Sequence, residues 1–177
     1  MRDRSAWRRF LPYCCAFALV SACATIGSFG SGAASYRSWV EGRVETRRLY
    51  DRGKQLFAAK LLAADDALKA RQEEVAPGYG FERRAKQTQF VVAVTAFSRR
   101  ELSPADLTWQ LGGQAPVRVA EVRTAAVHER LYPYAYPFYR VFLVDFETTA
   151  RGPFEIRSPY GRIEFDAETV AGLGASE

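Results

Sequence analysis

Apolar positions between Trp39 and Glu74 recur at the spacing of an α-helix, and charged residues fill the places between them. The positions that set this period are Val40, Val44, Tyr50, Phe57, Leu61, Ala64 and Leu68. No proline interrupts the run. The pattern predicts an amphipathic helix laid on the core of the body, or a helix that presents its apolar stripe to a partner or a second copy.

The same segment carries signals for where this helix begins, bends and ends. Ser38 and Glu41 have the spacing of a capping box at a helix N-terminus. Residues 76–78, Ala-Pro-Gly, form a stop signal. A glycine inside a helix costs about 1 kcal/mol, so a bend is expected at residues 51–53. The sequence therefore predicts a helical segment over residues 36–78.

Beyond Gly80 the pattern changes to the alternation of β-strands. Residues 89–97 are rich in β-branched and aromatic side chains and are apolar on both faces, which is typical of a central strand. Alternation and turn signals mark further strands at residues 107–111, 117–122, 137–147, 154–156 and 162–165. A turn signal, Ser-Pro-Tyr-Gly at residues 158–161, joins the last two.

These elements predict an α+β protein. About six strands within roughly 80 residues, separated by turn signals, are typical of an antiparallel sandwich of immunoglobulin-like type. The strands and helices do not alternate along the chain, so a doubly wound nucleotide-binding sheet is not expected. The expected architecture is a long N-terminal amphipathic helix followed by an immunoglobulin-like β-sandwich over residues 79–177.

The first residues have the composition of a signal peptide. Four arginines lie before Phe10, and an apolar stretch follows up to about Val20. From Phe10 to Ile26 the stretch comes to 17 residues, whereas a membrane-spanning helix needs about 20. We therefore expect a cleaved signal peptide over residues 1–22 rather than a membrane anchor.

The end of this segment, Val20-Ser21-Ala22-Cys23, resembles the lipobox of bacterial lipoproteins. The resemblance implies that Cys23 carries diacylglycerol on its sulfur, that the chain is cut just before it, and that the new amino terminus is acylated. Val20 stands where leucine is commoner in the family. Ala24 follows Cys23, where an aspartate would resemble the inner-membrane retention signal, so the resemblance implies the outer membrane of a bacterial cell envelope.

A flexible tether is expected after the cysteine. Residues 24–34 are rich in glycine, serine and alanine, a composition that behaves as a flexible coil. Residues 23–35 are therefore expected to link the bilayer to the body. The acylated Cys23 makes membrane lipid the first expected partner, since two or three acyl chains hold stably where one binds marginally.

The net charge argues against nucleic acid as a partner. The whole chain carries a formal charge of +5, but residues 23–177 hold 21 basic and 19 acidic groups, a net charge of +2. A basic footprint for nucleic acid is therefore weak.

Signatures of catalysis and of cofactors are few. All three cysteines lie in the first 23 residues, which excludes zinc ribbons and cysteine nucleophiles from the body. His128 is the only histidine, in a segment that predicts a loop, and neither phosphate-loop signature occurs. We expect no metal site, no cofactor and no catalytic residue.

Two pairs of strand carboxylates leave an enzymatic alternative open. Asp145 and Glu147, and likewise Glu164 and Asp166, stand two residues apart. That spacing places both carboxylates of a pair on one face of a strand, about 6–7 Å apart, a separation of the order that glycosidases use. The competing interpretation is a solvated strand face.

An aromatic segment between two arginines is the most unusual part of the body. The candidate residues for a ligand or partner are Arg130, Tyr132, Tyr134, Tyr136, Tyr139 and Arg140, with two prolines among them. Tyrosines on a stiff backbone suit sugar stacking or a protein interface, and the arginines suit a phosphate or an acidic sugar. Alternatively, the rings pack over the end of the sandwich.

Together these features predict a membrane-anchored envelope lipoprotein that acts as a non-catalytic binding or assembly module, with an envelope protein or glycan as partner. Two alternatives stay open. One is a carboxylate-dependent hydrolase of envelope glycans, and the other is a structural protein that self-assembles through the long helix.

Overall fold

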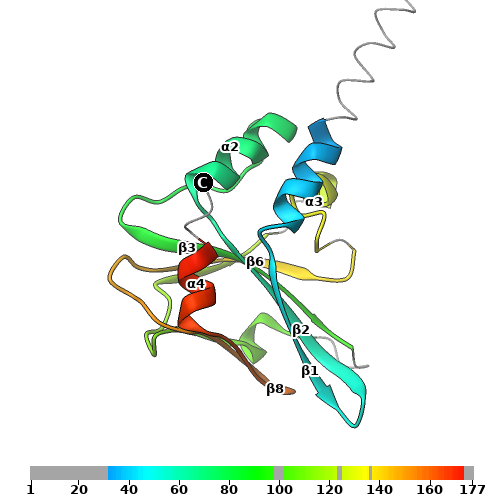
Figure 1. Cartoon of the computed structure of the whole chain (residues 1–177), viewed down its shortest axis with the longest axis vertical. Coiled ribbons are helices and arrows are strands. Elements are labelled where there is room, and N and C mark those ends of the chain that lie inside the picture. The colour runs from blue at the N-terminus through cyan, green and yellow to red at the C-terminus, as the bar shows by residue number, and fades with distance from the viewer. Residues whose placement is uncertain (1–31, 98–101, 123–124, 136, 174–177) are drawn as a thin grey trace, which may run out of the picture.

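The computed structural model describes residues 32–97, 102–122, 125–135 and 137–173 (Figure 1). A helix over residues 32–41 comes first. The elements that follow are β1 (Glu45–Asp51), β2 (Lys54–Ala63), α2 (Asp66–Val75), β3 (Gln87–Ala96), the 3-10 helix η2 (Pro104–Asp106), β4 (Thr108–Leu111), β5 (Arg118–Glu121), α3 (Ala125–Leu131), β6 (Arg140–Glu147), β7 (Phe154–Ser158), β8 (Gly161–Phe165) and α4 (Ala167–Leu173).

The strands form two antiparallel sheets. The large sheet has five strands in the order β1-β2-β3-β6-β5, and the small sheet has three in the order β4-β7-β8. β3 lies in the middle of the large sheet, as the apolar run at residues 89–97 predicts. The other strands predicted beyond Gly80 are also present within a few residues of their expected bounds.

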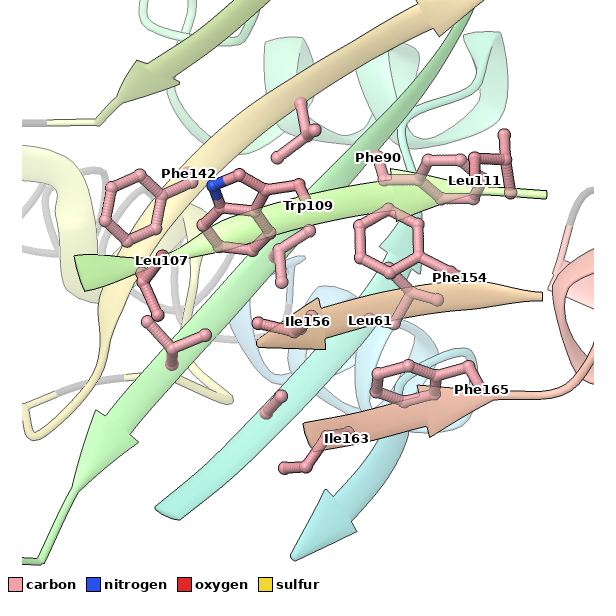
Figure 2. Packing of buried hydrophobic residues seen from close by; sticks show 14 of the residues in the cluster. Leu61, Phe90, Leu107, Trp109, Leu111, Phe142, Phe154, Ile156, Ile163 and Phe165 are labelled. Carbon is pink, nitrogen blue, oxygen red and sulfur yellow. The ribbon is translucent and has the colours of Figure 1, made fainter. Parts of the chain in front are cut away.

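One face of the large sheet packs against the small sheet around an inter-sheet cluster. Its aromatic members are Phe57, Phe90, Trp109, Phe142, Phe146, Phe154 and Phe165. Figure 2 shows Phe154 of β7 projecting toward the strands of the large sheet. Its ring centre lies 5.2 Å from that of Phe90 and 5.6 Å from that of Phe146, both at steep angles. Edge-to-face contacts of this kind add to the free energy of apolar burial.

The other face of the large sheet is covered by helices. The helix over residues 32–41, α2 and α3 lie together on one side of β3 and β6, with β8 and α4 on the other (Figure 1). The resulting helix-side cluster has as its largest members Tyr36, Val40, Leu62, Leu68, Phe81, Val91, Leu131, Tyr132, Tyr134, Val141 and Leu143. The molecule therefore has three layers: helices, the large sheet and the small sheet.

The prediction of a long helix over residues 36–78 is wrong. Residues 45–63 form the hairpin of β1 and β2. At its tip Arg52 and Gly53 both have positive φ, 46° and 79°, as a two-residue type I′ turn requires. The expected bend at residues 51–53 is therefore a complete reversal of the chain.

The reason lies in the burial of β2. Phe57 and Leu61 enter the inter-sheet cluster, while Leu62 enters the helix-side cluster. A strand covered on both faces loses its polar alternation, and its apolar residues then also match the helical period. Hydrogen-bonded pairing with β1 on one side and β3 on the other selects the strand over the helix.

The helical signals themselves are partly correct. α2 begins after the N-cap Asp65, whose carboxylate accepts a hydrogen bond from the Leu68 amide at 2.8 Å. It ends before Pro77, as expected. Ser38 and Glu41, in contrast, close a helix rather than open one. The helix over residues 32–41 also occupies the last part of the expected tether.

The mixture of helices and antiparallel strands is as predicted, but the immunoglobulin-like form is not confirmed. The large sheet is covered by helices on one face, and β2 from before residue 79 pairs with β3 from after it. Among the described residues, no helix is both long enough and apolar enough to cross a membrane.

Candidate ligand-binding cleft

A cleft of about 730 Å³ opens at one end of the two sheets. Its walls come from the end of β2, the start of β3, the end of β4, the β6–β7 connection and α4. Cavities of about 300–1,000 Å³ are typical of small-molecule sites. The cleft is therefore the first candidate for a functional site in the described part of the chain.

The floor of the cleft is apolar because it is the end of the inter-sheet cluster. Phe90, Leu111 and Ala63 line the cleft and belong to that cluster. Val170 of α4 packs against the same cluster and lines the opposite wall. α4 thus covers this end of the core only in part, and a bound molecule would extend the core.

Arg83 forms one charged wall, and its guanidinium is fixed by several bonds. Nε lies 3.3 Å from a carboxylate oxygen of Asp66, and Nη1 donates to Gln89 Oε1 at 3.1 Å and to the Gln87 carbonyl at 3.4 Å. The side chain is 30% exposed. Within the described residues, no hydrogen bond from Nη2 is found, so this nitrogen is available to a ligand.

Arg151 stands on the β6–β7 connection, which is held by a close contact between glycines. A Cβ on Gly112 would lie 1.7 Å from the Arg151 carbonyl oxygen, and Gly112 has a φ of +56°. Its amide donates to the Pro153 carbonyl at 2.9 Å. Only glycine allows this approach. The Arg151 guanidinium donates from Nη1 to the carbonyls of Thr148 and Ala150.

The acidic side of the cleft is largely neutralised. The Asp65 carboxylate lies 2.5 Å from Nη2 of Arg43, a side chain that is only 7% exposed. Asp66, the ion-pair partner of Arg83, is 86% exposed and is therefore well screened by solvent. Among the residues that line the cleft, Arg83 and Arg151 carry positive charge and Asp65 alone carries negative charge, which its ion pair with Arg43 compensates.

Two glutamines complete the polar lining. The Gln89 amide is fully used: it donates to Asp145 at 3.1 Å and accepts from Arg83 and from the Arg84 amide. Oε1 of Gln87 is buried and, within the described residues, accepts no hydrogen bond. A buried acceptor without a donor costs free energy, and a ligand with an N–H or O–H group would satisfy it.

The tyrosine-rich segment packs mainly against the sheet. Tyr132 and Tyr134 are 2% and 6% exposed, and both belong to the helix-side cluster. Tyr139 is partly buried, and its ring lies 4.6 Å from Nζ of Lys60, which also donates to the Tyr134 carbonyl. Tyr136 and Cys23 lie outside the described residues. Tyr132 and Tyr134 therefore pack against the body, as the alternative interpretation of this segment expects, whereas Phe138 is 77% exposed.

The two bracketing arginines do not come together. Arg130 is exposed on α3. Arg140 begins β6, forms an ion pair with Glu121 at 2.6 Å and donates to the Leu102 carbonyl. Tyr132, Tyr134 and Arg140 therefore contribute to packing and bonding within the protein and do not line the cleft, although Tyr132 also lines a smaller pocket of about 200 Å³.

Burial perturbs the tyrosine hydroxyls. Burial raises the pKa of Tyr132 to about 12, although a hydrogen bond with Gln72 opposes the shift. The pKa of Tyr36 is raised as well, again mainly by burial, and its hydroxyl donates to the Leu131 carbonyl at 2.7 Å. Both hydroxyls remain protonated at neutral pH, and that of Tyr36 acts as a hydrogen-bond donor.

The two carboxylate pairs lie at separate sheets, and Asp145, Glu164 and Asp166 form ion pairs with arginines. Asp145 on β6 is fully buried between Arg84 and Arg118, at 3.7 and 3.8 Å. Glu147, two residues on, is exposed. Arg84, just before β3, and Arg118, on β5, thus hold the Asp145 carboxylate in place.

The second pair is on the small sheet. Glu164 forms an ion pair with Arg162. Asp166 accepts hydrogen bonds from the amide and hydroxyl of Thr169 at the start of α4, and these bonds lower its pKa. Asp166 therefore stabilises the element that forms one wall of the cleft.

His128, expected in a loop, lies in α3. Its ring centre is 5.3 Å from that of Tyr132, and burial lowers its pKa, so the imidazole is neutral at pH 7. Within the described residues, no three histidine, cysteine, aspartate or glutamate side chains gather where they could hold a metal ion.

The cleft was missed by sequence reasoning because its lining comes from five separate segments. One local signal was present. Residues 87–89, Gln-Thr-Gln, place three polar side chains at the start of an otherwise apolar strand, which marks that end of the strand as wet. The paired glycines Gly112 and Gly152 are a second signal, but only their contact in space gives it meaning.

No protein-family model matches the chain, and comparisons with curated proteins and with solved structures give no significant match. The chemistry of the chain's own residues is therefore the basis for assigning a role to the cleft.

Proposed function

We propose that this protein is a cell-envelope lipoprotein, anchored to the outer membrane through acylated Cys23, whose body acts as a non-catalytic binding module. The observation that carries the proposal is the sequence Val20-Ser21-Ala22-Cys23 directly after a basic and then apolar start. Small residues before a cysteine at that place are the signal for lipid attachment in the bacterial lipoproteins that the segment resembles.

The start of the folded body supports a role close to the bilayer. The described part of the body starts at residue 32, and eight residues lie between it and Cys23 in the sequence. An extended chain spans at most about 3.3–3.6 Å per residue, which limits the reach to roughly 30 Å. A body on so short a link samples ligands at or near the membrane surface.

The cleft supports a binding role. It combines an apolar floor with a few fixed polar groups, which is the composition of small-molecule sites in general. The exposed Phe138 offers a second, smaller contact for an envelope protein or glycan.

The test is metabolic labelling with an alkyne fatty acid in a bacterial host. The wild-type chain should take up the label and lose residues 1–22, and Cys23→Ala should abolish the label and leave the precursor intact. Cys14→Ala with Cys15→Ala is the matched control, because these cysteines lie inside the apolar stretch and should not be needed. Label that persists in Cys23→Ala, or a mature protein that keeps Met1, would overturn the anchor.

A further inference from the structure

We propose that the cleft binds a small amphiphile with an oxyanion head group, an N–H or O–H donor next to it, and a short apolar tail. N-acylated amino acids have this chemistry, and so do acylated amino-alcohol phosphates. The inference deepens the proposed binding role and rests on it for where the ligand is met, but the cleft itself stands on residues far from Cys23.

The head group is specified by the two arginines. The Arg83 guanidinium cannot swing away, because Gln89, Asp66 and the Gln87 carbonyl hold it. Its Nη2 edge is left to meet an oxygen of the ligand. Arg151 adds a second positive charge to the same cleft. Guanidinium groups match the planar oxygens of carboxylates and phosphates and form strong, charge-assisted hydrogen bonds with them.

The donor is specified by Gln87. Gln87 lines the cleft, and its Oε1 is closed to solvent and accepts no hydrogen bond from the described residues. Gln87 and Arg83 are close, since Nη1 of Arg83 lies 3.4 Å from the Gln87 carbonyl. A ligand that gives an oxyanion to Arg83 therefore brings an adjacent amide N–H beside Gln87, whose side chain turns Oε1 toward the cleft to accept it.

The tail is specified by the floor and by α4. Phe90 and Leu111 present carbon surface continuous with the inter-sheet cluster, and Val170 and Ala171 present the side of α4. Burial of an apolar chain here gains roughly 25 cal/mol for each Å² removed from water. The volume of about 730 Å³ limits the tail to a short or folded chain.

The experiment uses the full chain in native membranes and four photoreactive probes with the same ten-carbon acyl tail. N-decanoylglycine carries both the carboxylate and the N–H. Its methyl ester lacks the charge, N-decanoylsarcosine lacks the N–H, and N-decanoyl-aminoethyl phosphate replaces carboxylate by phosphate. Crosslinked peptides are located by mass spectrometry, and the concentration for half-maximal labelling is measured for each probe.

N-decanoylglycine should label α4 and the cleft residues of β3 and β4 saturably. The methyl ester should need an approximately tenfold or higher concentration, as expected when a charge-assisted hydrogen bond is lost. The sarcosine probe should need roughly two- to tenfold more, the usual range for one neutral hydrogen bond. Comparison of the glycine and phosphate probes decides which oxyanion is preferred.

Variants test the residues. Arg83→Gln and Arg151→Gln should each raise the half-maximal concentration about tenfold. Ala171→Trp fills the cleft from the exposed side of α4 and should remove labelling there without disturbing the core. Arg157→Gln is the matched control, because that arginine is 59% exposed on β7 and does not line the cleft.

Labelling by the methyl ester equal to that by the acid, labelling that does not saturate, or labelling unchanged in Ala171→Trp would overturn the inference. If Arg83→Gln fails to fold, Arg151→Gln, Ala171→Trp and the probe series still decide. Cys23→Ala separates the two proposals: cleft labelling should persist in it. Loss of the anchor with an intact cleft would contradict only the lipoprotein, and the reverse would contradict only the ligand.

Discussion

The two faces of the large sheet differ in kind, although the same strands supply both. Toward the small sheet, β2 and β3 present Phe57, Leu61 and Phe90 to the aromatic inter-sheet cluster. Toward the helices, the same two strands present Lys60, Gln89 and Thr95 among apolar neighbours. Alternate residues of a strand point to opposite faces, so each strand serves a dry layer and a polar layer at once.

The comparison separates stability from positioning. Apolar burial is not directional, so the inter-sheet cluster stabilises the stacking of the sheets without fixing much else. Buried hydrogen bonds are directional and are costly when they are left unmade. The bonds of Tyr36, Gln72 and Arg43 therefore fix where the helices lie on the sheet, and through Asp65 and α4 they fix one wall of the cleft.

The largest effect is expected in the dry layer. Phe154→Ala removes a fully buried ring that contacts four other aromatic rings and should lower the free energy of unfolding by about 3–5 kcal/mol. Chemical denaturation measures it. Phe138→Ala, at a 77% exposed side chain, is the control and should change stability by no more than about 0.5 kcal/mol. Equal effects of the two would contradict the packing described here.

The next effect is expected where the helices meet. Arg43→Met should cost about 3 kcal/mol, because it breaks an ion pair whose arginine is 7% exposed. It also removes a bond to the Leu173 carbonyl at 3.3 Å, so hydrogen exchange in α4 should rise more than in β3. Arg37→Met, which breaks an exposed pair with Glu41, should cost less than about 0.5 kcal/mol.

The polar layer should also respond to alkaline pH. Burial raises the pKa of Tyr132 from 10.0 to about 12. Between these values the folded protein keeps a proton that the unfolded chain releases, so the free energy of unfolding falls as pH rises. The loss from this group approaches about 2–3 kcal/mol by pH 12.

Denaturation at several pH values, with tyrosinate absorbance as a second signal, checks this. Tyr132→Phe should flatten the slope above pH 10. It should not abolish the slope, since burial also raises the pKa of Tyr36 and Tyr134. A slope identical to that of the wild type would contradict the assignment.

The smallest effect compares two tyrosines of the same layer. Tyr36→Phe deletes the 2.7 Å bond to the Leu131 carbonyl and should cost about 1 kcal/mol. The Tyr134 hydroxyl is buried and finds no hydrogen-bond partner within the described residues, so Tyr134→Phe should be neutral or slightly stabilising. A loss in Tyr134→Phe as large as in Tyr36→Phe would show that the polar layer does not distinguish bonded from unbonded hydroxyls.

The strands beyond residue 80 could be predicted because their signals are local. The alternation in β8 and the turn before it need no knowledge of distant residues. β2 could not be assigned, because residues 58–63 combine good helix formers with burial on both faces, and only pairing with β1 and β3 selects the strand. α3 and α4, at seven residues each, are too short to show a clear helical period.

The cleft was even less accessible to prediction. Arg83 and Arg151 stand far apart in the chain and line one cavity only after β3 has paired with β6 and the small sheet has packed on the large one. The tyrosine-rich segment was singled out instead because its composition is unusual. Composition alone does not say whether a ring faces solvent or the sheet, and Tyr132 faces the sheet.

The helix over residues 32–41 has a mechanical consequence. A force on the chain upstream of it is transmitted to the folded body through Tyr36, which is bonded to α3. Just beyond the helix it is transmitted through Arg43, which is bonded to Asp65 and to the end of α4. The next element along the chain, β1, lies at an edge of the large sheet, where tension would peel its hydrogen bonds away one at a time. The contacts of the helix and of Arg43 thus bear the force first, and β1 is loaded only after those contacts have broken.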